Sequence, residues 1–481
     1  MNSNRSLSNL KFKLILPALL EAKSPDWRPI KYSLFPPLGL ATLAAFIPNE
    51  CETEIIDEHV ETVDINDHPD VVVIQVYITN AYRAYQIADH YRNRGSLVLL
   101  GGLHVTSLPH EAALHADVIF LGPGEDSFPR FLEDLKNGSI KKVYHSENRS
   151  LLNLPFPRRD LIKKQLYLVP NSITISRGCP HQCNFCYKHA FFAGGKSYYR
   201  LELERALAEI SGLKGKHLFF LDDHLLAYAP FAANLFDEMK GMGKVFQGAA
   251  TMESVMDDNL LKKAHDAGLR SLFIGFETMN SSNLNSANKN HNKLERYDLA
   301  IRKLHDMGIM INGSYVYGFD EDDSDVFKRT VDWAVSKGIT TATFHILTPY
   351  PGTKVYEQMQ SENRILTTNW NQYNTRQVVF KPNKLSPEAL KAGYDWSYTE
   401  FYNWSNIFQS ARQHEPFMEL ARHLAYSVAW KKMEPLWNYA IKLKQLNRAL
   451  PLLVNVLNQK KQNSNRLSNP LIIEKRDLLR A

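Results

Sequence analysis

The chain has 481 residues, of which 44% are hydrophobic and 22% charged, and a net charge of only +6, the profile of a soluble globular protein with several domains. Its basic residues form no stripe interleaved with stacking side chains, which argues against nucleic-acid binding. No apolar run reaches the ~20 residues of a transmembrane segment, and the first ten residues lack the apolar core of a secretion signal, so we expect a cytoplasmic location.

Residues 1–138 alternate strand-like and helix-like runs, the pattern of a doubly wound, Rossmann-type parallel sheet. The strand-like runs are rich in valine, isoleucine and leucine, as expected for strands that are covered on both faces. We predict strands at 10–16, 52–57, 70–76, 96–101 and 117–122, with helices at 38–47, 81–94, 109–115 and 127–137.

Ligands of such sheets bind beyond the carboxyl ends of the strands. Small and flexible residues gather at these ends, and glycine, which lacks a Cβ atom, lets the backbone approach a flat ligand closely. A flavodoxin-like domain whose glycines only form turns would show the same pattern. The candidate contact residues are Pro37, Leu38, Gly39, Thr79, Gly101, Gly102, His104, Gly122, Gly124 and Glu125.

Residues 139–169 are predicted to be a connector, because the run Leu154-Pro-Phe-Pro157 breaks regular structure. The alternation resumes over residues 170–364 in six further units, which predict a partial (β/α)6 barrel with its chemistry at the carboxyl ends of the strands. The strands are expected at 172–176, 217–222, 244–251, 271–277, 309–317 and 340–347, and the helices at 201–213, 230–242, 259–267, 293–307, 324–337 and 353–359.

Three of the four cysteines, Cys179, Cys183 and Cys186, follow the first strand of this second domain. Three thiolates can hold three irons of a [4Fe–4S] cube and leave the fourth open, whereas an electron-transfer cube takes four cysteines. The alternatives are a structural zinc site completed by His181 or His189, and unligated thiols in a turn. A disulfide scaffold is disfavoured, because so few cysteines in a long chain indicate a reducing compartment.

The spacing Cys179-x-x-x-Cys183-x-x-Cys186, with Phe185 before the last cysteine, resembles the signature of radical S-adenosylmethionine (SAM) enzymes. The resemblance implies that SAM chelates the open iron and is cleaved to a 5′-deoxyadenosyl radical, with electrons from an external donor of flavodoxin or ferredoxin type. It also implies SAM-binding roles for residues at the barrel mouth. These are Tyr187 after the last cysteine, Asp222, Gln247, Asn312, and Glu277 within Gly275-Phe-Glu-Thr278.

Three runs ahead of the cysteines, Pro36-Pro-Leu-Gly39, Gly101-Gly-Leu-His104 and Gly122-Pro-Gly-Glu125, resemble the cobalamin-binding domain that precedes many radical SAM modules. Many cobalamin proteins carry a cobalt-ligating histidine in an Asp-x-His-x-x-Gly motif after the first strand. Here Asp57-Glu58-His59 follows the second strand and Thr62 replaces the glycine. We therefore interpret His59 as a surface loop residue, and His104 as the better candidate for a cobalamin contact.

Residues 365–458 are predicted to form a helical domain rich in aromatic residues, which serve mainly as core and in part cap the barrel, and residues 459–481 a polar tail. The leading hypothesis is a cobalamin-dependent radical SAM methyltransferase that transfers a methyl group from methylcobalamin to an unactivated carbon of a small-molecule or lipid-like substrate. Two alternatives keep the SAM chemistry: a cyclase or rearrangement enzyme without methyl transfer, and an enzyme that has lost cobalamin. A zinc-binding interaction protein is the alternative from another class.

Overall fold

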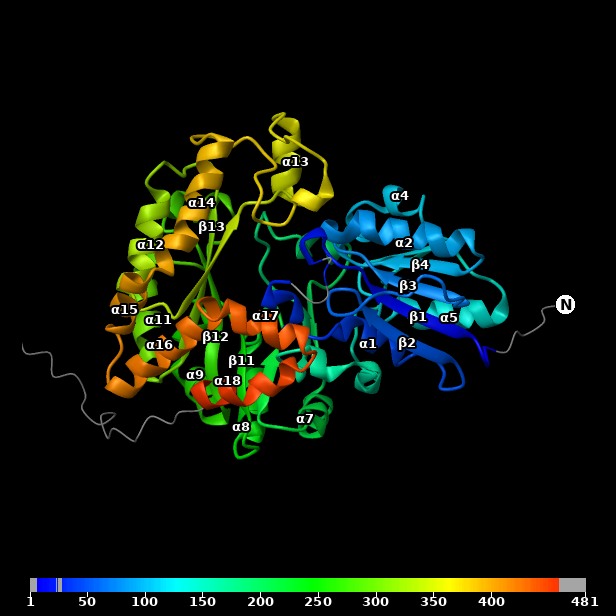
Figure 1. Ribbon diagram of the computed structural model, residues 1–481, viewed down its shortest axis with the longest axis horizontal. Helices are drawn as coiled ribbons and strands as arrows, with labels where there is room; N and C mark the ends of the chain where they lie inside the picture. The colour runs from blue at the N-terminus through cyan, green and yellow to red at the C-terminus, as the bar shows by residue number, and fades with distance from the viewer. Residues whose placement is uncertain (1–6, 23, 25–27, 458–481) are drawn as a thin grey trace, which may run out of the picture.

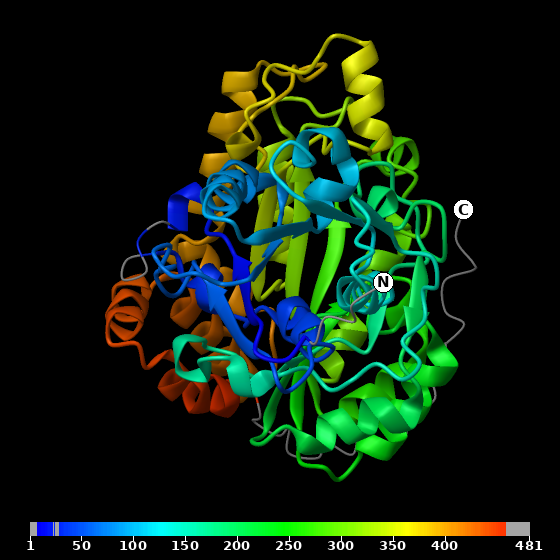
Figure 2. The same ribbon diagram turned by 90° about the vertical axis from the view of Figure 1, so that its right-hand side faces the viewer.

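The computed structural model describes residues 7–22, 24 and 28–457, so the predicted polar tail at 459–481 lies outside the described residues. Two α/β units lie side by side, and a layer of C-terminal helices packs against the second (Figure 1). Figure 2, turned by 90°, shows the sheet of the first unit in front of the barrel strands. None of the helices in the described ranges is long and apolar enough to cross a membrane.

Within the described part of the chain, the first unit contains a six-stranded parallel sheet in the order β2-β1-β3-β4-β5-β6. Its strands are β1 (Lys11–Leu16), β2 (Glu52–Asp57), β3 (Val71–Gln75), β4 (Leu97–Gly101), β5 (Val118–Leu121) and β6 (Val143–His145). Apolar clusters cover both faces of the sheet, as its valine-rich and leucine-rich strands require. The helices are α1 (Leu38–Ala44), α2 (Ala81–Asn93), α3 (Leu103–Ser107), α4 (Pro109–Ala112) and α5 (Ser127–Asn137).

Strand β6 is a correction to the sequence prediction, because it lies in the expected connector and extends the sheet beyond residue 138. It is an edge strand of three residues, in which Val143 and His145 are exposed and only Tyr144 is buried. So short a strand contains no apolar run for sequence analysis to detect.

The second unit is the predicted partial barrel, since the described strands form an open parallel sheet in the order β14-β13-β12-β11-β10-β7. Its strands are β7 (Ser172–Ile173), β10 (His217–Phe220), β11 (Val245–Ala250), β12 (Leu269–Glu277), β13 (Met310–Tyr317) and β14 (Thr341–Ile346). The helices are α6 (Lys188–Phe191), α7 (Leu203–Gly212), α8 (Ala229–Met239), α9 (Asp258–Ala267), α10 (Ser281–Ser286), α11 (Leu294–Asp306), α12 (Val326–Ser336) and α13 (Lys354–Ser361).

The C-terminal helices are α14 (Pro387–Phe401), α15 (Trp404–Ala411), α16 (Phe417–Lys431), α17 (Glu434–Lys442) and α18 (Leu450–Leu457). Helix α16 lies against the amino end of the barrel, because Ser427 donates a hydrogen bond to the carbonyl oxygen of Thr340, just before β14 (2.6 Å). Tyr394, Phe401 and Tyr402 are buried against the barrel, as the prediction of aromatic core residues requires.

Candidate functional site

The cysteine loop begins at the carboxyl end of the first barrel strand. The predicted strand 172–176 is divided into β7 and β8 (Ser176–Gly178), and β8 pairs with β9 (Tyr198–Arg200) to close the base of the loop. Gly178 has φ +76°, and a Cβ atom there would lie 1.9 Å from the carbonyl oxygen of Ser197. Only glycine satisfies both constraints, so this residue fixes the position of Cys179.

The three thiols are free and half-buried. Burial raises the pKa of Cys183 to about 12 and also raises that of Cys179, so stable thiolates in this loop require a nearby cation such as a metal cluster. The ligand atoms of His181 and His224 lie within 4.8 Å of one another and of the Cys179 sulfur. In the part of the chain that the structure describes, this group includes neither Cys183 nor Cys186, so the arrangement differs from a Cys3His zinc site.

Glu277 ends β12 at a β-bulge, where the pairing with β13 shifts register between Gly275 and Glu277. Its φ of +66° is unusual for a residue other than glycine, and such strained positions cluster at functional sites. The buried side chain forms an ion pair with Lys289. A Cβ atom on Gly275 would lie 2.3 Å from the Glu277 carboxylate, so the glycine makes room for this pair.

Asp222 follows β10 and is fully buried. Its carboxylate accepts hydrogen bonds from the backbone N–H groups of Ser176 (2.6 Å) and Ile175 (3.2 Å) and from the Ser176 hydroxyl. Burial nevertheless raises the pKa of Asp222 to about 6. The carboxylate thus holds the chain just ahead of the cysteine loop, while Asp223 pairs with Lys188 directly after it.

The other predicted SAM-binding residues, Tyr187, Gln247 and Asn312, lie in two different places. Tyr187 packs edge-on against Tyr350 (5.6 Å between ring centroids) beside the cysteine loop. Gln247 is the third residue of β11 rather than at its carboxyl end, and it faces a cavity inside the barrel together with Asn312. Gln247 donates to the hydroxyl of Tyr426 on α16 (3.2 Å). A SAM-binding role for these three residues, and for Asp222 and Glu277, stays a prediction.

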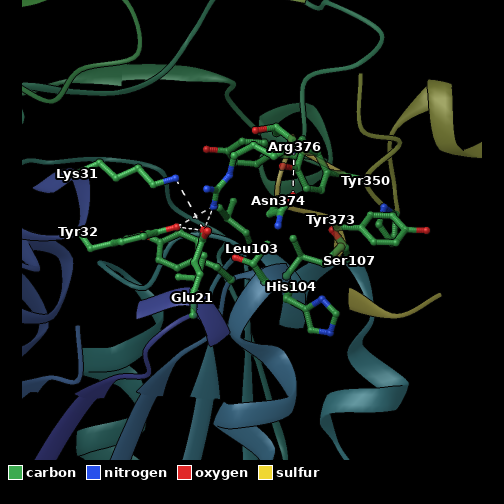
Figure 3. Close-up of a pocket in the computed structure, with 17 residues that line it drawn as sticks. Glu21, Lys31, Tyr32, Leu103, His104, Ser107, Tyr350, Tyr373, Asn374 and Arg376 are labelled. Atoms are coloured by element: carbon green, nitrogen blue, oxygen red, sulfur yellow. Dashed lines mark hydrogen bonds and ion pairs between the residues drawn. The ribbon is translucent and has the colours of Figure 1, made fainter. Parts of the chain in front are cut away.

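A pocket of about 270 Å³ lies between the first unit and the barrel. Thr79 and His104 line its first-unit wall and Tyr187 its barrel wall. Figure 3 shows His104 and Tyr350 beside this pocket. Glu21 lies at the centre of a polar group at one side, where it pairs with Arg376 and accepts a hydrogen bond from the Tyr32 hydroxyl. The pocket therefore places the ligand edge of the first sheet opposite the cysteine loop.

His104 occupies the wall of this pocket. Figure 3 shows its ring turned away from Glu21. Its Nε2 atom contacts Glu111 (3.0 Å), to which Trp370 also donates a hydrogen bond (3.1 Å). Among the described residues, no hydrogen-bond partner is found for its buried Nδ1 atom. Burial lowers the pKa of His104 and favours the neutral imidazole.

All five predicted glycines line a second cavity of about 230 Å³, which Arg177, Phe191 and Phe192 of the second unit also line. A Cβ atom on Gly102 (φ +120°) would lie 2.7 Å from the carbonyl oxygen of Val76. Pro37 and Leu38 are buried at the start of α1. The residues of the predicted set that line this cavity are Gly39, Gly101, Gly102, Gly122, Gly124 and Glu125.

The interpretation of His59 as a surface residue is wrong, because only 6% of the residue is exposed. Its Nδ1 atom contacts the Asp57 carboxylate (2.7 Å), and its ring stacks on Tyr32 (5.4 Å between centroids). The Asp-x-His spacing forms a local hydrogen-bonded pair that the sequence did not reveal.

Two family models match the chain, one over the first unit and one over the barrel. The B12 binding domain matches residues 32–132, and the Radical SAM superfamily matches residues 173–334. The chain belongs to the cobalamin-binding radical SAM family. Both the predicted family and the predicted fold class are confirmed, and the zinc-binding interaction protein is set aside.

Similarity to known proteins extends over most of the chain. Bacteriochlorophyllide d C-12(1)-methyltransferase of Chlorobaculum tepidum is 29% identical over 388 residues, 78% of this chain and 84% of the relative. Bacteriochlorophyllide d C-8(2)-methyltransferase of the same organism is 29% identical and covers 77% and 86%. The solved structure of the radical SAM methyltransferase TsrM from Kitasatospora setae shares the fold, with TM-score 0.65, 14% identity and coverage of 90% and 99%.

The cofactors of this radical SAM enzyme are a [4Fe–4S] cluster, SAM and cobalamin. The residues present fit them. Three free thiols in one loop suit a cluster with an open iron, and among the described residues the buried Nδ1 of His104, in the wall of the interface pocket, has no hydrogen-bond partner. The cavity lined by glycines leaves room against the backbone of the first unit.

Three charged residues of this enzyme escaped the sequence analysis. Arg177, just before Cys179, pairs with Glu125 of the first unit (2.6 Å). Arg149 donates hydrogen bonds to the carbonyl oxygens of Ala193 (2.8 Å) and Lys196 (3.0 Å) and so fixes the segment after the cysteines. Lys289, the partner of Glu277, lies in a loop with no sequence signal. The position of Arg177, two residues before the first cysteine, could have identified it from the sequence.

Proposed function

We propose that this radical SAM enzyme methylates an unactivated carbon of a small, largely apolar molecule. The interface pocket carries the proposal, because it sets Thr79 and His104 of the B12-binding unit against Tyr187 beside the cysteine loop. When bound, the cofactors supply a radical that removes a hydrogen atom and a methyl group that takes its place. The two relatives that methylate bacteriochlorophyllide support both the reaction and an apolar substrate.

In this proposal, the residues of the chain bind and orient the reactants. Cys179, Cys183 and Cys186 hold the cluster, and Asp222 fixes the segment that leads into their loop through three hydrogen bonds. Glu277, held by Lys289, offers a carboxylate at the mouth for the ammonium or ribose hydroxyl groups of SAM by charge-assisted hydrogen bonds. Docking the two units across one pocket supplies the proximity that a two-cofactor reaction needs.

We also propose how the parts of the chain act together and which partner supplies electrons. The B12-binding unit, the barrel and the C-terminal helices act as one catalytic unit, and Arg177–Glu125 joins the first two. An external low-potential donor of flavodoxin or ferredoxin type reduces the cluster. The ring-forming alternative without methyl transfer differs in its products, and the following experiment separates the two.

Reconstitution with iron, sulfide and hydroxocobalamin, followed by anaerobic reduction with titanium(III) citrate and addition of SAM carrying a CD3 group, tests the function. We expect about four irons per chain and a deuterated methyl group on the bound cobalamin, measured by mass spectrometry. Electron paramagnetic resonance of the reduced cluster should change when SAM is added. Cobalamin that binds but never acquires the label would contradict methyl transfer and favour the cyclase or rearrangement.

A further inference from the structure

A cavity of about 570 Å³ runs inside the barrel towards its amino end. This volume lies within the ~300–1,000 Å³ range of small-molecule sites. The barrel strands form one wall, helices α16, α17 and α18 form the other, and Leu34, Phe35, Leu168 and Val169 complete the lining. Figure 1 shows these helices beside the lower part of the barrel. The cavity is separate from the interface pocket and from the glycine-lined cavity.

The strand wall combines small and polar side chains with the aromatic rings of Phe219, Phe220 and Phe273. Strand pairing places Gln247 next to Ser271, and Asn312 next to both Phe273 and Thr341, at two successive levels of the barrel. Interiors of closed parallel barrels are normally filled by layers of bulky branched side chains. Here the side chains at these levels leave the interior hollow and offer a few hydrogen-bonding groups.

The helix wall is apolar. The indole N–H of Trp437 is already satisfied by the carbonyl oxygen of Ala429 (2.8 Å). Asp222 is the one charged residue among the described residues that line the cavity, so no cation there could pair with a phosphate or carboxylate. The helix residues that face the cavity are Tyr426, Ala429, Trp430, Met433, Leu436, Trp437, Ala440, Ala449, Leu452, Leu453 and Val456.

The two ends of the cavity differ. The upper end, towards the carboxyl ends of the barrel strands, reaches Leu221 and Asp222, directly below the cysteine loop. It also reaches Phe35, which leads into α1 of the first unit. At the other end, three lining residues are largely exposed: Met433 (38%), Leu436 (56%) and Leu452 (69%). Residues that line the cavity and also reach the surface mark its opening, between α17 and α18.

We propose that this cavity binds the body of the substrate, an uncharged ring system or lipid-like molecule, which enters between α17 and α18. Its apolar face packs against α16–α18, and its few polar atoms contact Gln247 and Asn312 on the strand wall. The carbon to be methylated lies at the upper end, near Asp222. Burial of apolar surface supplies the affinity. This inference rests on the proposed function and adds the class and location of the substrate.

The test uses progesterone, a neutral fused-ring probe with a polar atom at each end, in equilibrium dialysis against the reconstituted holoenzyme. Ala429→Trp fills the cavity from α16, whereas the matched control Ala425→Trp adds the same side chain at an exposed position of that helix. We expect saturable binding of one probe per chain, weakened at least tenfold by Ala429→Trp and unchanged by Ala425→Trp. Equal binding by all three proteins, or no saturable binding to the unaltered enzyme, would overturn the inference.

A second variant and a second readout guard against misfolding. Ala440→Phe fills the cavity from α17 and should weaken progesterone binding in the same way. Transfer of the CD3 group from SAM to cobalamin needs no substrate and should persist in both filled variants. Loss of probe binding with retained labelling supports the cavity. Failure of labelling in the unaltered enzyme, with probe binding intact, contradicts the proposed function instead.

Discussion

Around the cysteine loop, ion pairs such as Glu277–Lys289, Lys188–Asp223 and Arg177–Glu125 surround half-buried thiols. Among the described residues, the cavity towards the amino end of the same barrel has one charged side chain and a wall of apolar helix residues. Charged groups in a partly dry site stabilise charged ligands, whereas an uncharged lining favours apolar ones. One barrel thus keeps a polar cofactor region at its mouth and an apolar region below it, and the two can be altered separately.

Cys186→Ala should have the largest effect. It removes a cluster ligand, so iron content should fall and 5′-deoxyadenosine formation should drop below detection, because the open iron no longer binds SAM productively. Cys51→Ala, which replaces a buried cysteine in the first unit, is the matched control and should keep full iron content. Progesterone binding should be the same in both variants; a loss confined to Cys186→Ala would show that the two regions are not separable.

Glu125→Gln tests the link between the first unit and the cysteine loop. It leaves the Arg177 guanidinium unpaired; because both side chains are partly exposed, we expect a loss of about 2–3 kcal/mol in unfolding free energy. Chemical denaturation measures it, with the exposed Glu295→Gln as control. A stability equal to that of the unaltered enzyme would show that the ion pair does not hold the units together.

Among the ligands, Glu277→Gln should weaken only SAM binding, and it should also lower stability because it leaves the buried Lys289 ammonium group unpaired. Losing a charge-assisted hydrogen bond costs about 1.5–3 kcal/mol, so the apparent affinity for SAM should fall about 10- to 100-fold. The concentration dependence of 5′-deoxyadenosine formation measures this, and Glu295→Gln again serves as control. If cobalamin content or progesterone binding changed as much as SAM affinity, Glu277 would have a general structural role.

The smallest expected effect is the pH dependence of stability that Asp222 causes, at the point where the two regions meet. Its folded pKa of about 6 lies above the ordinary value, so the folded state binds the proton more tightly and loses stability as pH rises through that range. Between pH 5 and 7.5, the enzyme should lose about 1–2 kcal/mol relative to Asp222→Asn, from ~1.4 kcal/mol per pKa unit. Denaturation curves of both proteins at the two pH values measure it; an equal pH dependence would mean that Asp222 is ionised without cost.

The sequence predicted the strands that carry long apolar runs, such as 52–57, whose limits match β2. It missed β6, which has one buried residue, and the break between β7 and β8, where Asp222 binds the backbone from a position 46 residues away. The cysteine spacing is local, so the sequence alone was enough to recognise it. The cavity could not be predicted, because Gln247 and Trp437 line it from distant parts of the chain and no local pattern shows that they face the same space.

The burial of His59 also could not be predicted from the local sequence. Its burial depends on Tyr32, 27 residues earlier in the chain, and on Tyr167, which donates a hydrogen bond to the same Asp57 carboxylate (3.0 Å). The motif Asp-x-His therefore describes the local pair but not its surroundings. The roles assigned to individual cofactor-binding residues remain predictions for the same reason.

The central claim is that SAM reacts in two ways on this chain, at cobalamin and at the cluster. The most direct test quantifies S-adenosylhomocysteine and 5′-deoxyadenosine from the titanium-reduced holoenzyme and from Cys186→Ala. We expect both products from the holoenzyme and only S-adenosylhomocysteine from the variant. 5′-Deoxyadenosine without S-adenosylhomocysteine from the holoenzyme would contradict it.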